Sequence, residues 1–225
     1  MMELRIAEDI KKAYPELRLA YLEMRGMKIG TGSDKVTGMM KEESEKLLQA
    51  LTLDTVKDRE DFRAYRDFFW RIGVDPTKIR PAAEALVRRI LKGASLPRIN
   101  DFVDAYNISS AESGAPIAAF DLDTIEDDII LRISKSGEDF LGIGMEAPRT
   151  LQEGVPVMSS GDELIAIYPY RDADESKITI GTSDAILITC GVPGIQTQKL
   201  IEAANKARDY ILSVCGGSPS KIRCV

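Results

Sequence analysis

The spacing of apolar residues changes near residue 115, and this change limits the folds that the chain can adopt. Before it, apolar side chains recur every three or four residues, as in amphipathic helices. This spacing predicts helices over 3–13, 40–51, 58–72, 81–92 and 98–111. Apolar residues at alternate positions predict one early strand over 17–23. After it, short runs rich in β-branched residues predict strands over 129–133, 164–168 and 185–189, and then a helix over 196–214.

This order of elements favours an α+β fold in a single domain that spans residues 1–225. Helices of the N-terminal half then pack on a mostly antiparallel sheet or sandwich, because helices and strands are segregated rather than alternating. No internal repeat and no linker rich in Gly, Pro or Ser divides the chain. We also expect a mobile loop over 30–41, Trp70 in the core, and a loose tail from Gly216.

The chain contains no histidine, which limits the chemistry it can perform. Imidazole is the commonest general acid or base near neutral pH and a common metal ligand. A Ser–His–Asp triad, a Cys–His dyad and any metal site that includes histidine are therefore excluded. We predict no metal and no cofactor, so that any reaction depends on carboxylates, hydroxyls, amides, backbone groups or the substrate itself.

The net charge and the cysteine spacing indicate which partners and which cellular compartment to expect. Its net charge of −6 argues against a protein that coats a nucleic-acid duplex, although a local basic strip suffices to hold one RNA end. Cys190, Cys215 and Cys224 show no Cys-x-x-Cys spacing, which is typical of reduced thiols in the cytoplasm. No apolar stretch approaches the roughly 20 residues of a membrane span, so we predict a cytoplasmic protein without a membrane partner.

A polar stripe follows the helix predicted over 98–111. Asn100, Asp104 and Asn107 are spaced by about one turn and share a face, which Ser110 extends and which Ser109 adjoins. The stripe has two interpretations. It is either a solvent-exposed face with capping groups, or the wall of a pocket that holds an amino-acid amine and a ribose.

Basic residues gather where the helix over 81–92 ends. Arg88, Arg89 and Lys92 precede Gly93, and Arg98 follows shortly after. Cations at this end complement the helix dipole, and Arg89 can also pair with Glu84. The alternative interpretation is contact with RNA phosphates.

An ordered series of short motifs runs through roughly residues 60–190. Its members are Tyr65–Gly73 with Asp75-Pro76, Arg80-Pro81 through Lys92-Gly93, Leu96-Pro97-Arg98-Ile99-Asn100, Val103–Asn107, Gly114–Asp123, and Glu175–Thr179 with Thr182. In this order and spacing the series resembles the B3/B4 domain, the editing domain of the phenylalanyl-tRNA synthetase beta subunit. It is more similar still to the free-standing single-domain relatives of that domain.

The resemblance implies hydrolysis of a wrongly attached amino acid from the 3′ end of tRNA. Asn107 matches an asparagine that lines the editing pocket of the synthetase. Ala118 stands where bacterial synthetases have a histidine before Ala-Phe-Asp, so that contact is absent here. The synthetase glutamate that recognises the tyrosine hydroxyl corresponds to Asp174 or Glu175.

These matches lead to a functional hypothesis: a free-standing enzyme that deacylates mischarged tRNA. Asn107, Asp174 and Glu175 are then the catalytic candidates. The candidates for substrate binding are Asn100, Asp104, Ser109, Ser110, Ala118, Thr179 and Thr182, and those for RNA contact are Arg88, Arg89, Lys92 and Arg98. Two alternatives remain open: a non-catalytic module that binds tRNA or an amino acid, and an unrelated small-molecule enzyme on the same scaffold.

Overall fold

Two five-stranded sheets lie at the centre of the structure, a computed structural model that describes residues 2–225. The first, sheet A, has the order β1-β4-β7-β8-β9, with strands Leu4–Ile6, Ile129–Ile133, Pro156–Ser160, Glu163–Ile167 and Arg171–Asp172. The second, sheet B, has the order β11-β2-β10-β3 with β12 also paired to β2, and its strands are Ser218–Pro219, Leu19–Arg25, Ala185–Cys190, Ile117–Asp121 and Arg223–Cys224. Strands β5 (Asp139–Phe140) and β6 (Arg149–Thr150) form a separate pair.

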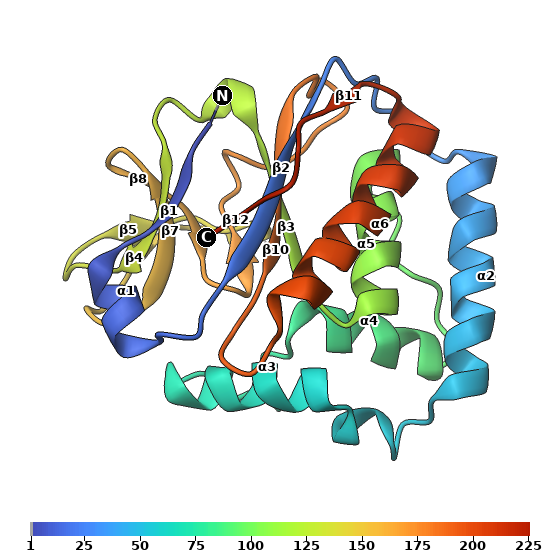
Figure 1. Cartoon of the computed structure of the whole chain (residues 1–225), viewed down its shortest axis with the longest axis horizontal. Helices are drawn as coiled ribbons and strands as arrows, with labels where there is room; N and C mark the ends of the chain where they lie inside the picture. Colours follow the sequence, from blue (N-terminus) through green and yellow to red (C-terminus); the bar gives the residue numbers. More distant parts are fainter. Residues whose placement is uncertain (1) are drawn as a thin grey trace.

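Helices cover the face of sheet B that lies away from sheet A (Figure 1). Helices α5 (Asp101–Ser113) and α6 (Thr197–Cys215) pack on that face, and α2 (Asp34–Ala50) and α4 (Ala82–Leu91) lie outside them. Helix α3 (Glu60–Arg71) runs along the lower side of the view, and α1 (Glu8–Ala13) lies beside sheet A. The 3-10 turns are Val56–Asp58 and Leu122–Thr124.

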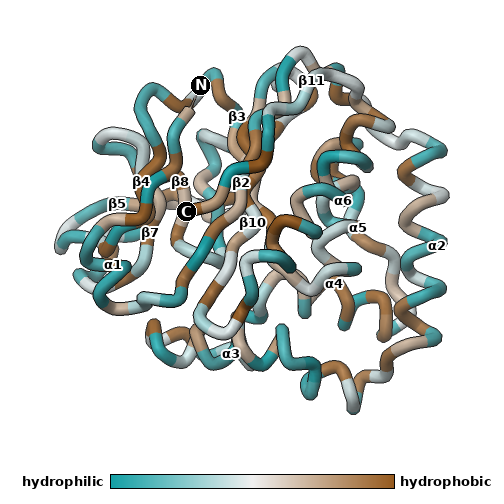
Figure 2. The backbone as a smooth tube through the Cα atoms, viewed as in Figure 1, coloured by the Kyte–Doolittle hydropathy of each residue, from teal (hydrophilic) through white to brown (hydrophobic). Residues whose placement is uncertain are grey.

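Strand β3 separates two apolar cores, because successive residues of a strand point to opposite faces of the sheet. Ala118 and Phe120 belong to the core shared with sheet A, whereas Ile117 and Ala119 belong to the core shared with α5 and α6. Figure 2 shows hydrophobic residues along the strands of sheet B, between these two layers. Gly114, with a φ of 76°, ends α5 in a left-handed turn that leads into β3.

The α+β class predicted from the sequence is confirmed. The expected helices over 58–72, 81–92, 98–111 and 196–214 correspond to α3, α4, α5 and α6, and the expected strands correspond to β2, β4, β8 and β10. The pairs formed by β10 with β2 and β3, and by β7 with β4 and β8, are antiparallel as expected, whereas β1 pairs with β4 in parallel.

Two expectations for the N-terminal part are wrong. Residues 3–13 form strand β1 and then α1, because Leu4 and Ile6 are buried on either side of exposed Arg5, which is the alternation of a strand. Residues 34–41 are helical rather than loop, since Val36 and Met40 begin the stripe that buries α2 against its neighbours.

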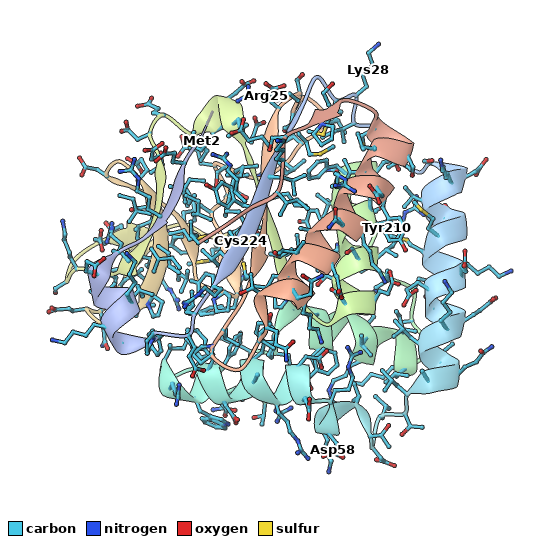
Figure 3. The ribbon with its side chains drawn as sticks, in the orientation of Figure 1. Met2, Arg25, Lys28, Asp58, Tyr210 and Cys224 are labelled. Carbon is cyan, nitrogen blue, oxygen red and sulfur yellow. The ribbon has the colours of Figure 1, made fainter. Side chains whose placement is uncertain are left out.

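Two expectations for the surface are also wrong. Trp70 is 57% exposed, because Phe62, Phe68 and Phe69 supply the buried side of α3 and Trp70 lies off that side. The tail is not loose, since β11 and β12 pair with β2; Cys224 of β12 is labelled in Figure 3 where the tail crosses that strand.

Candidate functional site

A small cavity of about 80 Å³ lies beside the edge strand β3, between sheets A and B. We call it the inter-sheet cavity. Strands β3, β7, β8, β9 and β10 all contribute to its wall, so both sheets shape it. The side chains that matter for its chemistry are those of Ala118, Met158, Tyr168, Asp172 and Cys190. The substrate-binding candidate Ala118 therefore lies in the wall of a real cavity.

Asp172 is the carboxylate among the residues that line this cavity. It is half-buried on β9, and its side chain forms no hydrogen bond or ion pair within residues 2–225. Its neighbour Arg171 donates instead to the carbonyl oxygen of Ile143 at 2.9 Å. Burial raises the pKa of Asp172 to about 7, and the charge of Arg171 offsets only part of that effect.

The floor of the cavity is fixed by buried tyrosines. The Tyr168 hydroxyl donates to the carbonyl oxygen of Gly191, and the Tyr65 hydroxyl donates to that of Cys190 at 2.7 Å. The Tyr168 ring also packs edge-on against Phe68, with ring centroids 6.2 Å apart. Both hydroxyls already donate to backbone carbonyls, so Asp172 is the charged side chain that the lining offers to a ligand.

Asn107 lies half-buried on α5, next to Tyr106 and outside the lining of the cavity. Burial, and then the charges of Asp172 and Asp104, raise the pKa of Tyr106. Tyr106 is therefore within electrostatic range of Asp172, and this part of α5 lies near β9. Within residues 2–225 the Asn107 side chain forms no hydrogen bond, so its amide has no structural role there.

The other polar residues of the predicted stripe have structural partners. Asn100 caps α5 by accepting from the backbone N–H of Val103 at 2.9 Å. Asp104 accepts from the backbone N–H of Ile99 at 2.8 Å, and its second oxygen lies 3.0 Å from Arg98 Nε. Both side chains are almost fully buried, so neither faces solvent.

Ser109 and Ser110 also use their hydroxyls for packing. Ser109 donates to the carbonyl oxygen of Ala203 on α6 at 2.9 Å, and Ser110 donates to that of Ala115 at 2.9 Å. Both are buried at contacts between elements and not among the residues that line the inter-sheet cavity.

The segment after β9 crosses the ends of α5 and β3. Asn100 Nδ2 donates to the carbonyl oxygen of Ile178 at 3.2 Å, and Thr182 donates to Asp121 Oδ2 at 2.5 Å. Thr182 also accepts from the backbone N–H of Thr179 at 3.0 Å, which closes the turn. The structure therefore brings this segment against α5 and β3, as the site hypothesis requires, but Thr179 and Thr182 stabilise the turn itself.

Asp174 and Glu175 lie elsewhere than expected. Asp174 pairs with Lys177 at 2.7 Å, and both side chains are about two-fifths exposed. Glu175 lines a separate acidic cleft of about 710 Å³, together with Glu126, Asp127, Asp139, Asp162 and Glu163. The two neighbouring carboxylates therefore lie outside the inter-sheet cavity, whereas Asp172 lies in its lining. Asp172 was not among the candidates predicted from the sequence. Its position shortly after the strand predicted over 164–168, which forms β8, could have indicated a carboxylate at the end of a buried strand.

Most of the candidate RNA contacts are held by protein groups. Arg88 donates to the buried carboxylate of Glu84 at 2.6 Å, and Arg98 pairs with Asp104. The Arg89 guanidinium donates to the carbonyl oxygen of Ser95. Lys92 is exposed and has no ion pair within the described part of the chain, so it is the freest of the four for contact with RNA.

Two features are absent from residues 2–225. No group of three or more His, Cys, Asp and Glu residues is placed to hold a metal ion. No helix there combines the length and the apolar character that crossing a bilayer requires.

Comparison with known families decides the relationship of the chain. The model of the B3/4 domain matches residues 64–216, which include α4, α5, β3 and the whole lining of the inter-sheet cavity. The chain belongs to the B3/4 domain family. This B3/4 chain is 26% identical, over 189 residues and 74% of its length, to the phenylalanine–tRNA ligase beta subunit of Aquifex aeolicus. It is 31% identical over 116 residues, 51% of its length, to the corresponding subunit of Clostridium tetani.

A solved structure supports the same fold. An N-terminal fragment of the phenylalanyl-tRNA synthetase beta subunit from Pyrococcus horikoshii is similar to 97% of this chain, with a TM-score of 0.53 and 15% identity. The match covers 50% of that fragment. The B3/4 chain spans only 24% of the Aquifex subunit and 14% of the Clostridium subunit.

Proposed function

We propose that this B3/4 chain is a free-standing deacylase that removes a wrongly attached amino acid from the 3′ end of tRNA. The observation that carries the proposal is the inter-sheet cavity, in which Ala118 and the unpartnered carboxylate of Asp172 line one small space. Membership of the B3/4 family supports the tRNA synthetase context. The cytoplasm, where charged tRNA is made and used, is the compartment that we propose.

The reaction needs little from the protein, because an aminoacyl ester is already activated. A water oxygen attacks the carbonyl carbon, the bond from that carbon to the ribose oxygen breaks, and the ribose oxygen receives a proton. Holding the ester and the water in place lowers the barrier. Asp172 provides a charge for the α-ammonium group. Asn107 lies outside the lining, on the part of α5 near β9, and its amide has no hydrogen-bond partner within residues 2–225, so we assign to it the orientation of the water.

The direct test is to incubate the protein with a panel of mischarged tRNAs and to follow ester loss. We expect at least one ester to be lost faster than by spontaneous hydrolysis. Asn107→Ala should abolish that acceleration while the melting temperature stays within a few degrees. Loss of every ester at the spontaneous rate would reject the deacylase.

A second function, a module that binds an amino acid or aminoacyl group without hydrolysis, is favoured by one observation. Ala118 places a methyl group where the resemblance expects histidine, so the cavity contains no imidazole. Calorimetry with amino-acid amides separates the two functions. Binding of an amide without turnover of the matching ester would support the module.

A further inference from the structure

We infer that the inter-sheet cavity selects a small amino acid, with a side chain no larger than that of alanine or serine, and that Asp172 holds its α-ammonium group. This inference rests on the proposed function and specifies its substrate class. It is carried by the size of the cavity, the rigidity of its walls and the position of its single carboxylate.

The volume of the cavity excludes an aromatic side chain. A dry cavity of about 150 Å³ in a protein core is large enough to hold benzene. The inter-sheet cavity measures about 80 Å³, roughly half of that space. A phenyl or phenol ring therefore requires the walls to move apart, whereas a methyl or hydroxymethyl group does not.

The walls resist such movement because they belong to the core of both sheets. Tyr168, Met158 and Ile167 are each no more than 1% exposed. The Tyr168 hydroxyl donates to the carbonyl oxygen of Gly191, the residue that follows Cys190 of the lining. Enlarging the space means breaking this bond or forcing apart close-packed side chains, which costs on the order of 1–3 kcal/mol.

The polar groups suit an ammonium ion beside a short side chain. The carboxylate of Asp172 faces the cavity without a partner, and an ammonium ion there stabilises the charged form of the carboxylate. The Tyr168 hydroxyl already donates to a backbone carbonyl, so Asp172 is the charged acceptor of the lining, and the ammonium group occupies it. The polar groups of the cavity thus favour an ammonium group over the hydroxyl of tyrosine.

The test compares esters of different size on one tRNA: alanyl, seryl, phenylalanyl and tyrosyl. We expect the alanyl and seryl esters to be hydrolysed at least about tenfold faster, in kcat/KM, than the two aromatic esters. Ala118→Leu fills the cavity and should remove the acceleration for alanyl and seryl esters. Should this variant melt well below the parent, Ala118→Val serves as the milder filling. Asp172→Asn should raise KM at least about tenfold, whereas the control Asp162→Asn, on the exposed β7–β8 turn, should leave KM unchanged.

A second readout keeps failure of the inference distinct from failure of the proposed function. Calorimetry with alaninamide and phenylalaninamide measures recognition without hydrolysis. Stronger binding of alaninamide, lost in Asp172→Asn, would support the inference even if no ester were hydrolysed. Equal or faster hydrolysis of aromatic esters would overturn the inference and leave the deacylase standing. Failure of both amides to bind, with no ester hydrolysed, would overturn both.

Discussion

Buried carboxylates in the helical layer and in the inter-sheet cavity have contrasting surroundings. At the helical layer, Glu84 is fully buried and receives hydrogen bonds from both Arg66 and Arg88. Burial alone would raise the pKa of Asp61, but hydrogen bonds from Arg59 and Lys199 hold that pKa below its usual value. In the cavity, Asp172 has no such cation.

The contrast separates carboxylates that stabilise the protein from one that is available to a ligand. A buried charge with cations on it is part of the structure, and removing either partner leaves the other uncompensated. A carboxylate that is half-buried without a partner costs stability while it is charged. Such a group is a candidate for binding, because a ligand with the opposite charge recovers that cost.

The largest expected effect comes from breaking a partnered group. Glu84→Gln removes the charge that two arginines share, so we expect the free energy of unfolding to fall by about 3–5 kcal/mol. Urea unfolding followed by circular dichroism measures the change. A loss below about 1 kcal/mol would show that the arginines simply turn to solvent. It would contradict the view that Glu84 stabilises the fold through its two arginines.

Glu43 sharpens the comparison, because it is a buried carboxylate in the helical layer with only a distant cation, Lys46 Nζ, at 4.0 Å. It lies near Glu112, which is bonded to Tyr210 on the side of α6 that faces α2 (Figure 3). Burial first, and then the charge of Glu112, raise the pKa of Glu43 to about 7, while Lys46 and Lys206 oppose the shift.

The raised pKa of Glu43 predicts how the free energy of unfolding depends on pH. Since the folded pKa exceeds the unfolded value of 4.5, stability from this group is complete below pH 4.5 and is lost as the pH rises towards 7. We expect Glu43→Gln to be about 2 kcal/mol more stable than the parent at pH 8 and nearly equal to it at pH 4. Asp172 titrates in the same direction, so the difference between parent and variant, rather than the parent's profile, is the measurement. A difference that does not change with pH would contradict the assignment.

Two asparagines of one helix extend the comparison to uncharged groups. Asn100 caps α5 and also bonds to the carbonyl of Ile178, so Asn100→Ala should cost about 1–2 kcal/mol. Asn107 has no bond to lose, and Asn107→Ala should change the free energy of unfolding by less than about 0.5 kcal/mol. Thermal and urea unfolding of both variants give the answer. Equal losses would mean that Asn107 has a structural partner after all.

One expected change in stability is a gain. Asp172→Asn removes a charge that is unfavourable in the folded state above pH 7, so we expect the variant to be about 1 kcal/mol more stable at pH 8, after allowance for its contact with solvent. In the parent, deacylation above the spontaneous rate should increase with pH through about 7, as Asp172 becomes charged. A less stable variant would place Asp172 among the structural carboxylates.

Sequence periodicity predicted the elements that bury one regular stripe. Helices α3, α4 and α6 each have such a stripe, and the spacing of their apolar residues was sufficient. Strands β4, β8 and β10 were instead predicted from short runs rich in β-branched residues, and every residue of β10 is buried. Strands β11 and β12 have two residues each and depend on β2, almost two hundred positions away in the chain. No local pattern contains that information.

The site was predicted less completely, for a similar reason. The polar stripe of α5 was visible, but whether a hydroxyl is exposed depends on what covers it: Ser109 is covered by Ala203 of a helix that comes much later in the chain. Asp172 of β9 and Ala118 of β3 line the same cavity because their two sheets pack together. The packing of the two sheets brings these residues together, and no local sequence pattern predicts it.

Strand β3 separates two layers, with the core shared with sheet A on one side and the core shared with α5 and α6 on the other. Ala118 and Phe120 pack on the side of sheet A, whereas Ile117 and Ala119 pack on the side of α5 and α6, and Ile117 also reaches the lining of the cavity. We therefore expect a larger side chain at 118 to act on the cavity, and one at 119 to act on the seating of the helices. One short strand thus gives mutagenesis separate access to the two layers.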